Sequence, residues 1–136
     1  MSYRKLAVIA LATLVAAPAL ALDAEQAQKA TETRQSVLKV VGWNIGPLGA
    51  MARDLVPYDA EIVARNAQRI AWMSSMIPDA FRADTRPHDV TTEALPVIWE
   101  NYARFEELAA NTQASAERLA EIAAGGDEAA AKQAIG

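Results

Sequence analysis

The spacing of apolar residues constrains the fold of this sequence more than any other feature. From residue 38 onward they recur every three or four positions, and they almost nowhere alternate with a period of two. Such steps place side chains on one face of an α-helix. Three stripes of this kind are present: Leu38, Val41, Ile45, Leu48, Ala52 and Leu55; then Val63, Ala67, Ile70, Ser74, Ile77 and Phe81; then Ile98, Tyr102, Phe105, Ala109, Thr112, Ala116 and Leu119. We therefore predict an all-α fold in which each long helix turns one apolar face toward its neighbours.

The first stripe crosses a stretch that disfavours a helix. Gly42 and Gly46 lower the helix propensity, and the ring of Pro47 collides with the carbonyl four residues back. The helix therefore either kinks or ends here. We favour a kink, because the stripe keeps its phase through Pro47. The Pro-Tyr pair at 57–58 then ends the helix, and Asp59 is placed to cap the next one.

The rest of the chain divides at turn-forming residues. The polar stretch 82–92 predicts the longest loop, and Pro96 suits the first turn of a third long helix. The two glycines at 125–126 end that helix, and Asp127 is placed to cap a fourth. This fourth helix has fewer than three turns before Gly136, too few to cover three long helices. Either the sequence is a fragment whose last helix continues, or it is a three-helix protein with a frayed tail.

The N-terminus has the three parts of a secretory signal peptide. Arg4 and Lys5 give a basic start, residues 6–17 are apolar, and an Ala-Leu-Ala triplet closes the segment. The apolar part is well short of the roughly 20 residues that cross a bilayer. We therefore expect residues 1–21 to be a signal peptide removed on export, which leaves 22–136 as one helical domain without a membrane anchor.

Composition excludes several classes of function. Removing the predicted signal peptide also removes Arg4 and Lys5. The remaining chain then has 11 of the 13 Lys and Arg residues and all 17 Asp and Glu residues, which gives it a formal net charge of −6. No basic face is then expected for nucleic acid. The sequence has no Cys, which excludes disulfides and thiolate metal sites among these residues. Its single His, His88, cannot build a His-rich zinc or di-iron site.

The residue pattern offers no constellation for catalysis by side chains. His88 lies beside Asp89 in the polar loop, where we expect it to be solvated. Glu106 and Glu107 are adjacent on an outward helix face, so they are expected to be solvated and not to act as acid and base. No glycine-rich phosphate-binding motif is present. We therefore expect the chain not to be an enzyme.

A candidate binding site lies on the first two helices. Arg34 and Gln35 precede Leu38 by one turn, so a cation and an amide flank the start of an apolar stripe. The planar fork of an arginine suits a flat apolar ligand with carboxylates at one edge. Met51 and Phe81 would add polarisable and aromatic surface. The competing interpretation is that Leu38, Met51 and Phe81 are ordinary core residues, and the spacing alone favours it.

Five short motifs occur in order along nearly the whole chain. They are Arg-Gln-Ser-Val-Leu at 34–38, Gly-Pro-Leu-Gly-Ala-Met at 46–51, Pro-Tyr-Asp-Ala at 57–60, the spaced residues Pro96, Ile98, Trp99 and Phe105, and Ala-Gly-Gly-Asp at 124–127. Together they resemble the cytochromes c′, exported four-helix bundles that carry one covalent haem. The resemblance implies an antiparallel four-helix bundle whose fourth helix is incomplete in the given chain.

The resemblance also implies roles for individual residues. Arg34 and Gln35 would lie near the haem propionates, and Leu38 would cover the distal face of the iron. Phe81 would line the pocket, with Met51 beside it. An apolar distal residue leaves the iron five-coordinate and open to nitric oxide or carbon monoxide. The family further implies a periplasmic haem protein for electron transfer or gas binding, a homodimer formed through the first two helices, and a small redox partner of unidentified kind.

The defining motif of the family, Cys-x-x-Cys-His, is absent from the sequence. In the family this motif carries both thioether bonds of haem c and the proximal His. We therefore expect the attachment motif and the axial His beyond Gly136, in a longer parent protein. Two alternatives stay open: a haem-free exported bundle that acts as a binding or interaction module, and a non-covalent b-type haem bundle with Met51 on one side of the pocket.

Overall fold

The computed structural model describes residues 22–135, so the predicted signal peptide lies outside the described residues. This part of the chain forms three long helices, α1 (Ala24–Ala52), α2 (Ala60–Phe81) and α4 (Tyr102–Ala124), and two short ones, α3 (Val97–Glu100) and α5 (Glu128–Ile135). It contains no strand, which confirms the predicted all-α class. Within the same residues, no helix combines the length and the hydropathy needed to cross a bilayer.

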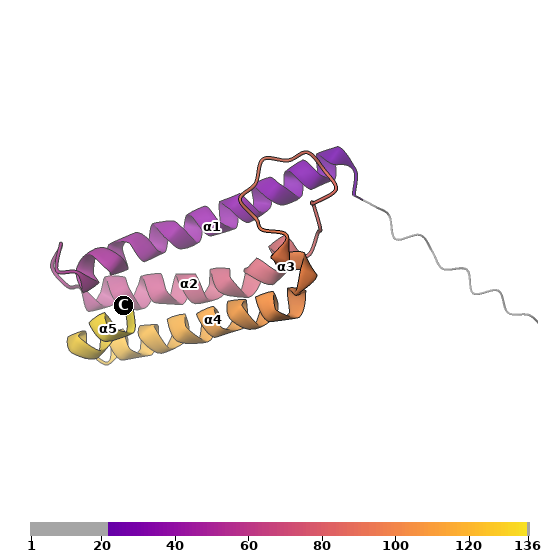
Figure 1. The fold of residues 1–136 in the computed structure, drawn as a ribbon. Coiled ribbons are helices and arrows are strands. Elements are labelled where there is room, and N and C mark those ends of the chain that lie inside the picture. The colour runs from indigo at the N-terminus through magenta and orange to yellow at the C-terminus, as the bar shows by residue number, and fades with distance from the viewer. Residues whose placement is uncertain (1–21, 136) are drawn as a thin grey trace, which may run out of the picture.

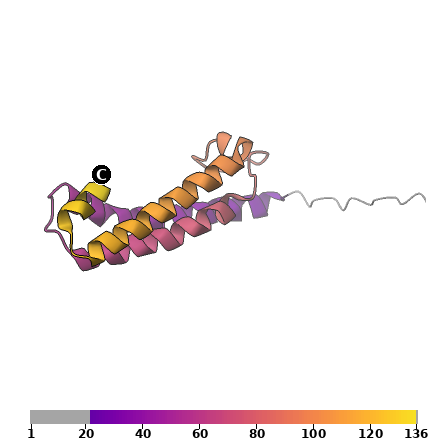
Figure 2. The ribbon, with the colours of Figure 1, turned by 90° about the horizontal axis from the view of Figure 1, so that it is seen from below.

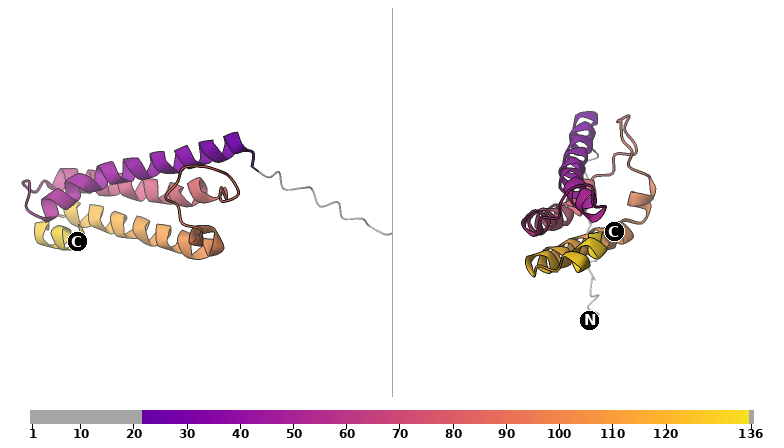
Figure 3. Two further views of the ribbon diagram at one scale, coloured as in Figure 1. Left: turned by 45° about the horizontal axis from the view of Figure 1, so that its top comes forward. Right: turned by 90° about the vertical axis from the view of Figure 1, so that its left-hand side faces the viewer.

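The three long helices lie side by side, each antiparallel to the one before it (Figure 1). α2 is central, because it packs along both α1 and α4, whereas α1 and α4 share no extensive contact. α5 turns back at the end of α4 and contacts both α4 and α1 (Figures 2 and 3). The arrangement is the predicted antiparallel four-helix bundle, with α5 as its short fourth member.

Helix α1 begins with a reciprocal cap and runs through its proline. The Asp23 carboxylate accepts a hydrogen bond from the Gln26 N–H at 2.8 Å, and the Gln26 side chain accepts one from the Asp23 N–H at 3.0 Å. Pro47 lies inside the helix, so the alternative that the helix ends there is wrong. The helix ends two residues before Asp54, which adopts left-handed backbone with a φ of 57°. Leu55 therefore lies outside the helix, and the predicted stripe is one turn too long.

The caps predicted for the later helices are present. Asp59 Oδ1 accepts a hydrogen bond from the Ile62 N–H at 3.0 Å, and Asp127 Oδ1 accepts one from the Ala130 N–H at 2.9 Å. Gly126 follows α4 with a φ of 79°, a conformation that residues with a Cβ rarely adopt. The predicted boundaries at these three points are confirmed.

The third predicted helix is divided at Asn101, a break that the apolar spacing does not indicate. Asn101 leaves helical backbone with a φ of −135° and a ψ of 60°. Contacts with the end of α2 account for the break. The Trp99 Nε1–H donates a hydrogen bond to the Phe81 carbonyl at 2.9 Å. The Tyr102 hydroxyl donates one to the Pro78 carbonyl. α3 and the start of α4 are therefore tied to α2 separately.

The buried apolar core lies at the α5 end of the bundle. It comprises Leu48, Met51, Val63, Ala67, Ile70, Ala71, Ala116, Leu119, Ala120, Ala123 and Ala131. Six of these eleven residues are alanine, so the helices can approach one another closely here. The core residues of α1 come from the end of that helix, and those of α2 come from its start.

The first predicted stripe does not form the contact between α1 and α2. Of its members only Leu48 is buried, whereas Leu38 and Ile45 are exposed. The side chains that α1 buries are instead Ala27, Thr31, Arg34, Asn44, Leu48 and Met51. Leu38 and Ile45 each line a cavity, whereas Leu55 lies in the exposed turn after α1. The spacing misassigns them because side chains that line a cavity recur with the same period as those in a core.

Helix α5 is fixed to the turn between α1 and α2. Ala131 is fully buried in the core. Lys132 Nζ lies 2.6 Å from Asp54 Oδ1 and 2.7 Å from Glu128 Oε1, so it pairs with both carboxylates. The same ammonium group lies 5.9 Å from the centre of the Tyr58 ring. The short fourth helix is thus held by burial and by a small polar cluster together.

Candidate functional site

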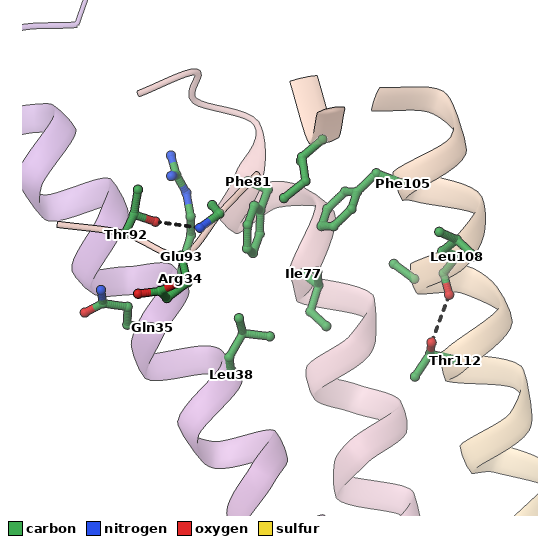
Figure 4. Close-up of a pocket in the computed structure, with 13 residues that line it drawn as sticks. Arg34, Gln35, Leu38, Ile77, Phe81, Thr92, Glu93, Phe105, Leu108 and Thr112 are labelled. Carbon is green, nitrogen blue, oxygen red and sulfur yellow. Dashed lines mark hydrogen bonds between the residues drawn. The ribbon is translucent and has the colours of Figure 1, made fainter. Parts of the chain in front are cut away.

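An apolar cavity lies between α1, α2 and α4, at the end of the bundle opposite the core (Figure 4). Its volume is about 450 Å³, within the range of about 300–1,000 Å³ usual for small-molecule sites. It is lined by Arg34, Gln35, Leu38, Ile77, Phe81, Thr92, Glu93, Ala94, Ile98, Phe105, Leu108, Ala109 and Thr112. A smaller cavity of about 220 Å³ adjoins it toward α5 and shares Thr112.

Helix α1 forms one wall of the cavity. Gln35 and Leu38 lie one turn apart and therefore share a side of the helix. The Gln35 Nε2 group donates a hydrogen bond to the Thr91 carbonyl at 3.1 Å, which fixes the amide at the edge of the cavity. Leu38 is 45% exposed and stands across the cavity from Ile77 of α2 (Figure 4). This wall thus offers apolar surface with one polar group at its end.

Aromatic side chains form the opposite wall. The ring centres of Phe81, at the end of α2, and Phe105, in α4, lie 4.9 Å apart with the planes tilted by 50°. Trp99 lies 6.5 Å from Phe81, and Tyr102 lies 6.0 Å from Phe105. Tilted aromatic pairs at these distances attract each other beyond the burial of their area. The wall is therefore a packed aromatic surface.

The segment between α2 and α3, residues 82–96, closes one edge of the cavity, and we call it the rim segment. It contributes Thr92, Glu93 and Ala94 to the lining. The Ala94 N–H donates a hydrogen bond to Thr92 Oγ1 at 3.1 Å (Figure 4). With Gln35, these residues give an apolar cavity one polar edge. The arrangement suits a ligand with a flat apolar body and polar groups along one side.

Arg34 is almost completely buried, with 2% of its surface exposed. Its Nε donates a hydrogen bond to the Ala80 carbonyl at 3.0 Å, and its Nη2 donates one to the Ala83 carbonyl at 2.6 Å. A third, from Nη1 to Thr85 Oγ1, measures 2.9 Å. Burial lowers the pKa of Arg34, and the nearby charge of Asp84 opposes that shift. In Figure 4 the guanidinium points away from Leu38, so its polar atoms serve the rim segment.

The structure places four of the five predicted site residues in the cavity lining: Arg34, Gln35, Leu38 and Phe81. Met51 lies elsewhere. It is 4% exposed and belongs to the core at the α5 end. The prediction that Met51 lies beside the pocket therefore needs correction, because α1 serves the core at one end and the cavity at the other. The alternative of a non-covalent b-type haem bundle relies on Met51 as an iron ligand beside the pocket, and Met51 does not line the pocket.

Sequence reasoning missed the polar edge of the cavity. Thr92, Glu93 and Ala94 belong to a loop without periodicity, so no pattern marks them. Phe105 belongs to the third predicted stripe, and its aromatic character could have singled it out. His88 is half-buried and does not line the main cavity; it lines an adjoining one of about 250 Å³ that shares Thr92 and Ala94 with it.

Comparison with known proteins identifies the family of this fold. A sequence model of the cytochrome c′ family matches residues 29–136. The chain belongs to the cytochrome c′ family. The resemblance inferred from the five motifs is thereby confirmed.

Individual cytochromes of this family are similar over most of their length. Cytochrome c-554 of Cereibacter sphaeroides is 37% identical over 113 residues, which cover 76% of this chain and 74% of that protein. Cytochrome c′ of Halomonas halodenitrificans is 35% identical over 104 residues, 74% of this chain and 79% of that one. The structure of cytochrome c′ from Shewanella frigidimarina matches with a TM-score of 0.74 and 31% identity, covering 83% of this chain and 87% of that one.

The cofactor of the cytochrome c′ family is haem c, and the cavity fits the body of a haem. The volume of the cavity, its apolar lining and its aromatic wall suit a flat porphyrin ring. At the polar edge the Gln35 amide and the Thr92 hydroxyl can donate hydrogen bonds to the carboxylates that a haem carries on one side, whereas the Glu93 carboxylate has the same charge as they have. These residues could therefore hold the porphyrin ring of the haem.

The attachment of haem c is not provided by these residues. The sequence contains no Cys, so none of its residues can form a thioether bond. The cavity lining contains no His, Met or Cys, and within residues 22–135 no group of three His, Cys, Asp or Glu side chains is placed to hold a metal ion. The described residues supply the pocket and not an axial ligand.

Proposed function

We propose that the cavity is the haem site of a periplasmic c-type cytochrome that transfers electrons, binds small gases such as nitric oxide and carbon monoxide, or does both. The observation that carries the proposal is the exposed side chain of Leu38 in a lining without His, Met, Cys or Tyr. Haem iron, when bound, can change its oxidation state or hold a diatomic gas. The chain's own residues supply shape, apolar surroundings and a polar edge.

The lining favours a five-coordinate iron. Haem iron takes a sixth protein ligand from side chains such as His or Met. Leu38 offers none, and as an apolar group it favours small uncharged molecules over anions at the same place. The apolar walls contributed by Ile77 and Leu108 extend this preference across the cavity. We therefore propose that the protein is a carrier or gas-binding cytochrome and has no enzymatic activity.

Export to the periplasm fits this proposal. Residues 1–21 have the sequence pattern of a secretory signal peptide, which directs a chain out of the cytoplasm. The alternative of a haem-free binding module receives no support from the comparisons, because the similar proteins reported above are cytochromes.

A second copy of this chain is the partner we propose for the outer surface of α1 and α2. Val40 and Trp43 on α1, and Trp72 and Met76 on α2, are exposed and line none of the three cavities described above. Exposed apolar side chains on two adjacent helices can be buried against the same surface of a second copy in a homodimer. Trp72→Glu should convert a dimer to a monomer in light scattering, whereas Leu55→Glu should not. A monomeric wild-type protein would rule the dimer out.

The experiment that tests the haem proposal is an intact mass with a visible spectrum of the protein purified from the periplasm of its source. We expect a mass that exceeds, by one haem, that of a polypeptide longer than residues 22–136, because these residues contain no Cys to attach the haem. We also expect a Soret band that survives extraction with acid-acetone, because a thioether-bound haem stays with the protein. A colourless protein would overturn the proposal and favour the haem-free binding module.

A second experiment tests the cavity itself. The protein without cofactor is titrated with free haem, and binding is followed by absorbance. Leu38→Glu places a charge in the apolar wall and should weaken binding at least about tenfold. The matched control Leu55→Glu places the same charge in the exposed turn after α1 and should leave binding unchanged. Equal affinities for both variants would place the haem outside this cavity.

A further inference from the structure

The buried cation Arg34 is the one strongly charged group at the cavity that the proposed function leaves without a role of its own. A carboxylate-bearing ligand could pair with it directly, or the guanidinium could act on the cavity from behind. We propose that Arg34 is a positioning residue. It fixes the rim segment, and through it the polar edge of the cavity, and its guanidinium does not bind the carboxylates of the ligand. The second half of this inference rests on the proposed haem site.

The hydrogen bonds of Arg34 all lead away from the cavity. They join α1 to the last turn of α2 at Ala80 and to the start of the rim segment at Ala83 and Thr85. These bonds use three of the five N–H groups of an arginine, one on each nitrogen. The Thr85 side chain is itself buried, with 1% of its surface exposed, so the bond lies out of water. A guanidinium engaged in this way holds three points of the fold in one geometry.

Aromatic rings hold the guanidinium from two further directions. Its central carbon lies 5.3 Å from the centre of the Phe81 ring and 5.1 Å from that of Trp99. Cation–π contacts at such distances stabilise a desolvated cation. The Trp99 ring also lies 5.8 Å from the guanidinium of Arg86, a residue of the rim segment. Arg34 is therefore packed into the aromatic wall as well as bonded to the rim segment.

The position of the rim segment determines the polar edge. Thr85 lies seven residues before Thr92, and the segment between them is shaped by the His88 N–H, which donates to the Thr85 carbonyl at 3.0 Å. The neighbouring residue Gln35 adds a second tie from α1 at the Thr91 carbonyl. Two consecutive residues of α1 thus hold both ends of the loop that presents Thr92 and Glu93 to the cavity.

Direct pairing of Arg34 with a ligand would break this arrangement. Two N–H groups of the guanidinium take no part in these bonds, but the group points away from Leu38 (Figure 4). Turning it toward a carboxylate beside Leu38 would leave two carbonyls and the buried Thr85 hydroxyl without their donor. Buried polar groups that lose their partner destabilise the fold. In the described part of the chain Arg34 forms no direct ion pair, so its charge is stabilised by carbonyl dipoles, by two aromatic faces and by the nearby charge of Asp84.

The first test measures hydrogen exchange of the rim segment in the protein without ligand. Arg34→Lys keeps the positive charge but replaces the planar guanidinium, whose three donors hold the rim segment, by a single ammonium group. The backbone amides of residues 83–93 should therefore exchange at least about tenfold faster. Thr85→Val removes one acceptor and should give a smaller rise in the same amides. Thr91→Val, an exposed change in the same segment, is the control and should have no effect. Unchanged exchange in Arg34→Lys, with native circular dichroism, would overturn the proposal.

The second test separates positioning from direct binding. Each variant is titrated with haem and with haem dimethyl ester, which has no free carboxylates. A positioning role predicts that Arg34→Lys weakens both ligands by the same factor, about tenfold, and that Thr85→Val weakens both by less. A loss confined to haem with free carboxylates would show that Arg34 binds them directly. If the wild-type protein bound neither ligand, the proposed haem site would fail, and the exchange test would still decide the role of Arg34.

Discussion

The two ends of this bundle are built from the same helices and packed in different ways. At the α5 end, Leu48 and Met51 of α1 join alanines of α2 and α4 in a closed core. At the other end, Leu38, Ile77 and Phe105 line a cavity of about 450 Å³. Small side chains let the helices approach at the closed end, whereas aromatic rings and the rim segment border open space at the other. Stability therefore resides at one end, and the other is shaped for a ligand.

The largest expected effect tests this division within a single helix. Met51→Ala should lower the free energy of unfolding by about 2–5 kcal/mol, because it leaves a hole in the closed core. Leu38→Ala should lower it by less than about 1 kcal/mol, because that side chain already faces the cavity. Urea unfolding followed by far-UV circular dichroism measures both. Equal losses would mean that the cavity end is as tightly packed as the core.

Enlarging side chains on α4 should produce the opposite contrast. Ala123→Leu overfills the closed core and should lower the free energy of unfolding by about 1–3 kcal/mol. Ala109→Leu adds the same atoms beside the cavity and should be neutral or raise it by about 0.5–1 kcal/mol. Thermal unfolding of the two variants without ligand is the measurement. A clear loss of stability in Ala109→Leu would show that no usable space exists there.

Much of the fold could be predicted because local chemistry determines it. Asp59 and Asp127 accept hydrogen bonds from the first turns of their helices whatever surrounds them, and Gly126 adopts a left-handed conformation that few other residues tolerate. The break at Asn101 could not be predicted in this way. It depends on the hydrogen bond from Trp99 to the end of α2, a contact between distant parts of the chain.

The candidate site was predictable only on its helical side. Gln35 and Leu38 follow from the period of α1, but that period could not place Met51, because core and cavity residues share it. Thr92 and Glu93 lie in a loop whose position depends on hydrogen bonds from residues about 50 positions earlier in the chain. A single sequence contains no local sign of such bonds.

The two capping residues offer a smaller test of how far the closed end extends. Asp59→Ala removes the cap of α2, the central helix, and should lower the free energy of unfolding by about 1 kcal/mol. Asp127→Ala removes the cap of the eight-residue α5 and should mainly speed hydrogen exchange in that helix. Comparing global unfolding with local exchange separates the two. If Asp127→Ala lowered global stability as much as Asp59→Ala, α5 would be an integral part of the closed core.

The smallest expected effect concerns the ligand end alone. In the haem-containing protein, Leu38→Ala should speed carbon monoxide binding about two- to fivefold, roughly less than 1 kcal/mol in the barrier, because it opens the face that an incoming gas must cross. Stopped-flow absorbance of the reduced protein measures the rate. Leu55→Ala removes the same atoms from the exposed turn after α1 and should leave the rate unchanged. An unchanged rate in Leu38→Ala would show that this residue does not lie on the path of the gas. The cavity would then bind the porphyrin ring of the haem without controlling access to its iron.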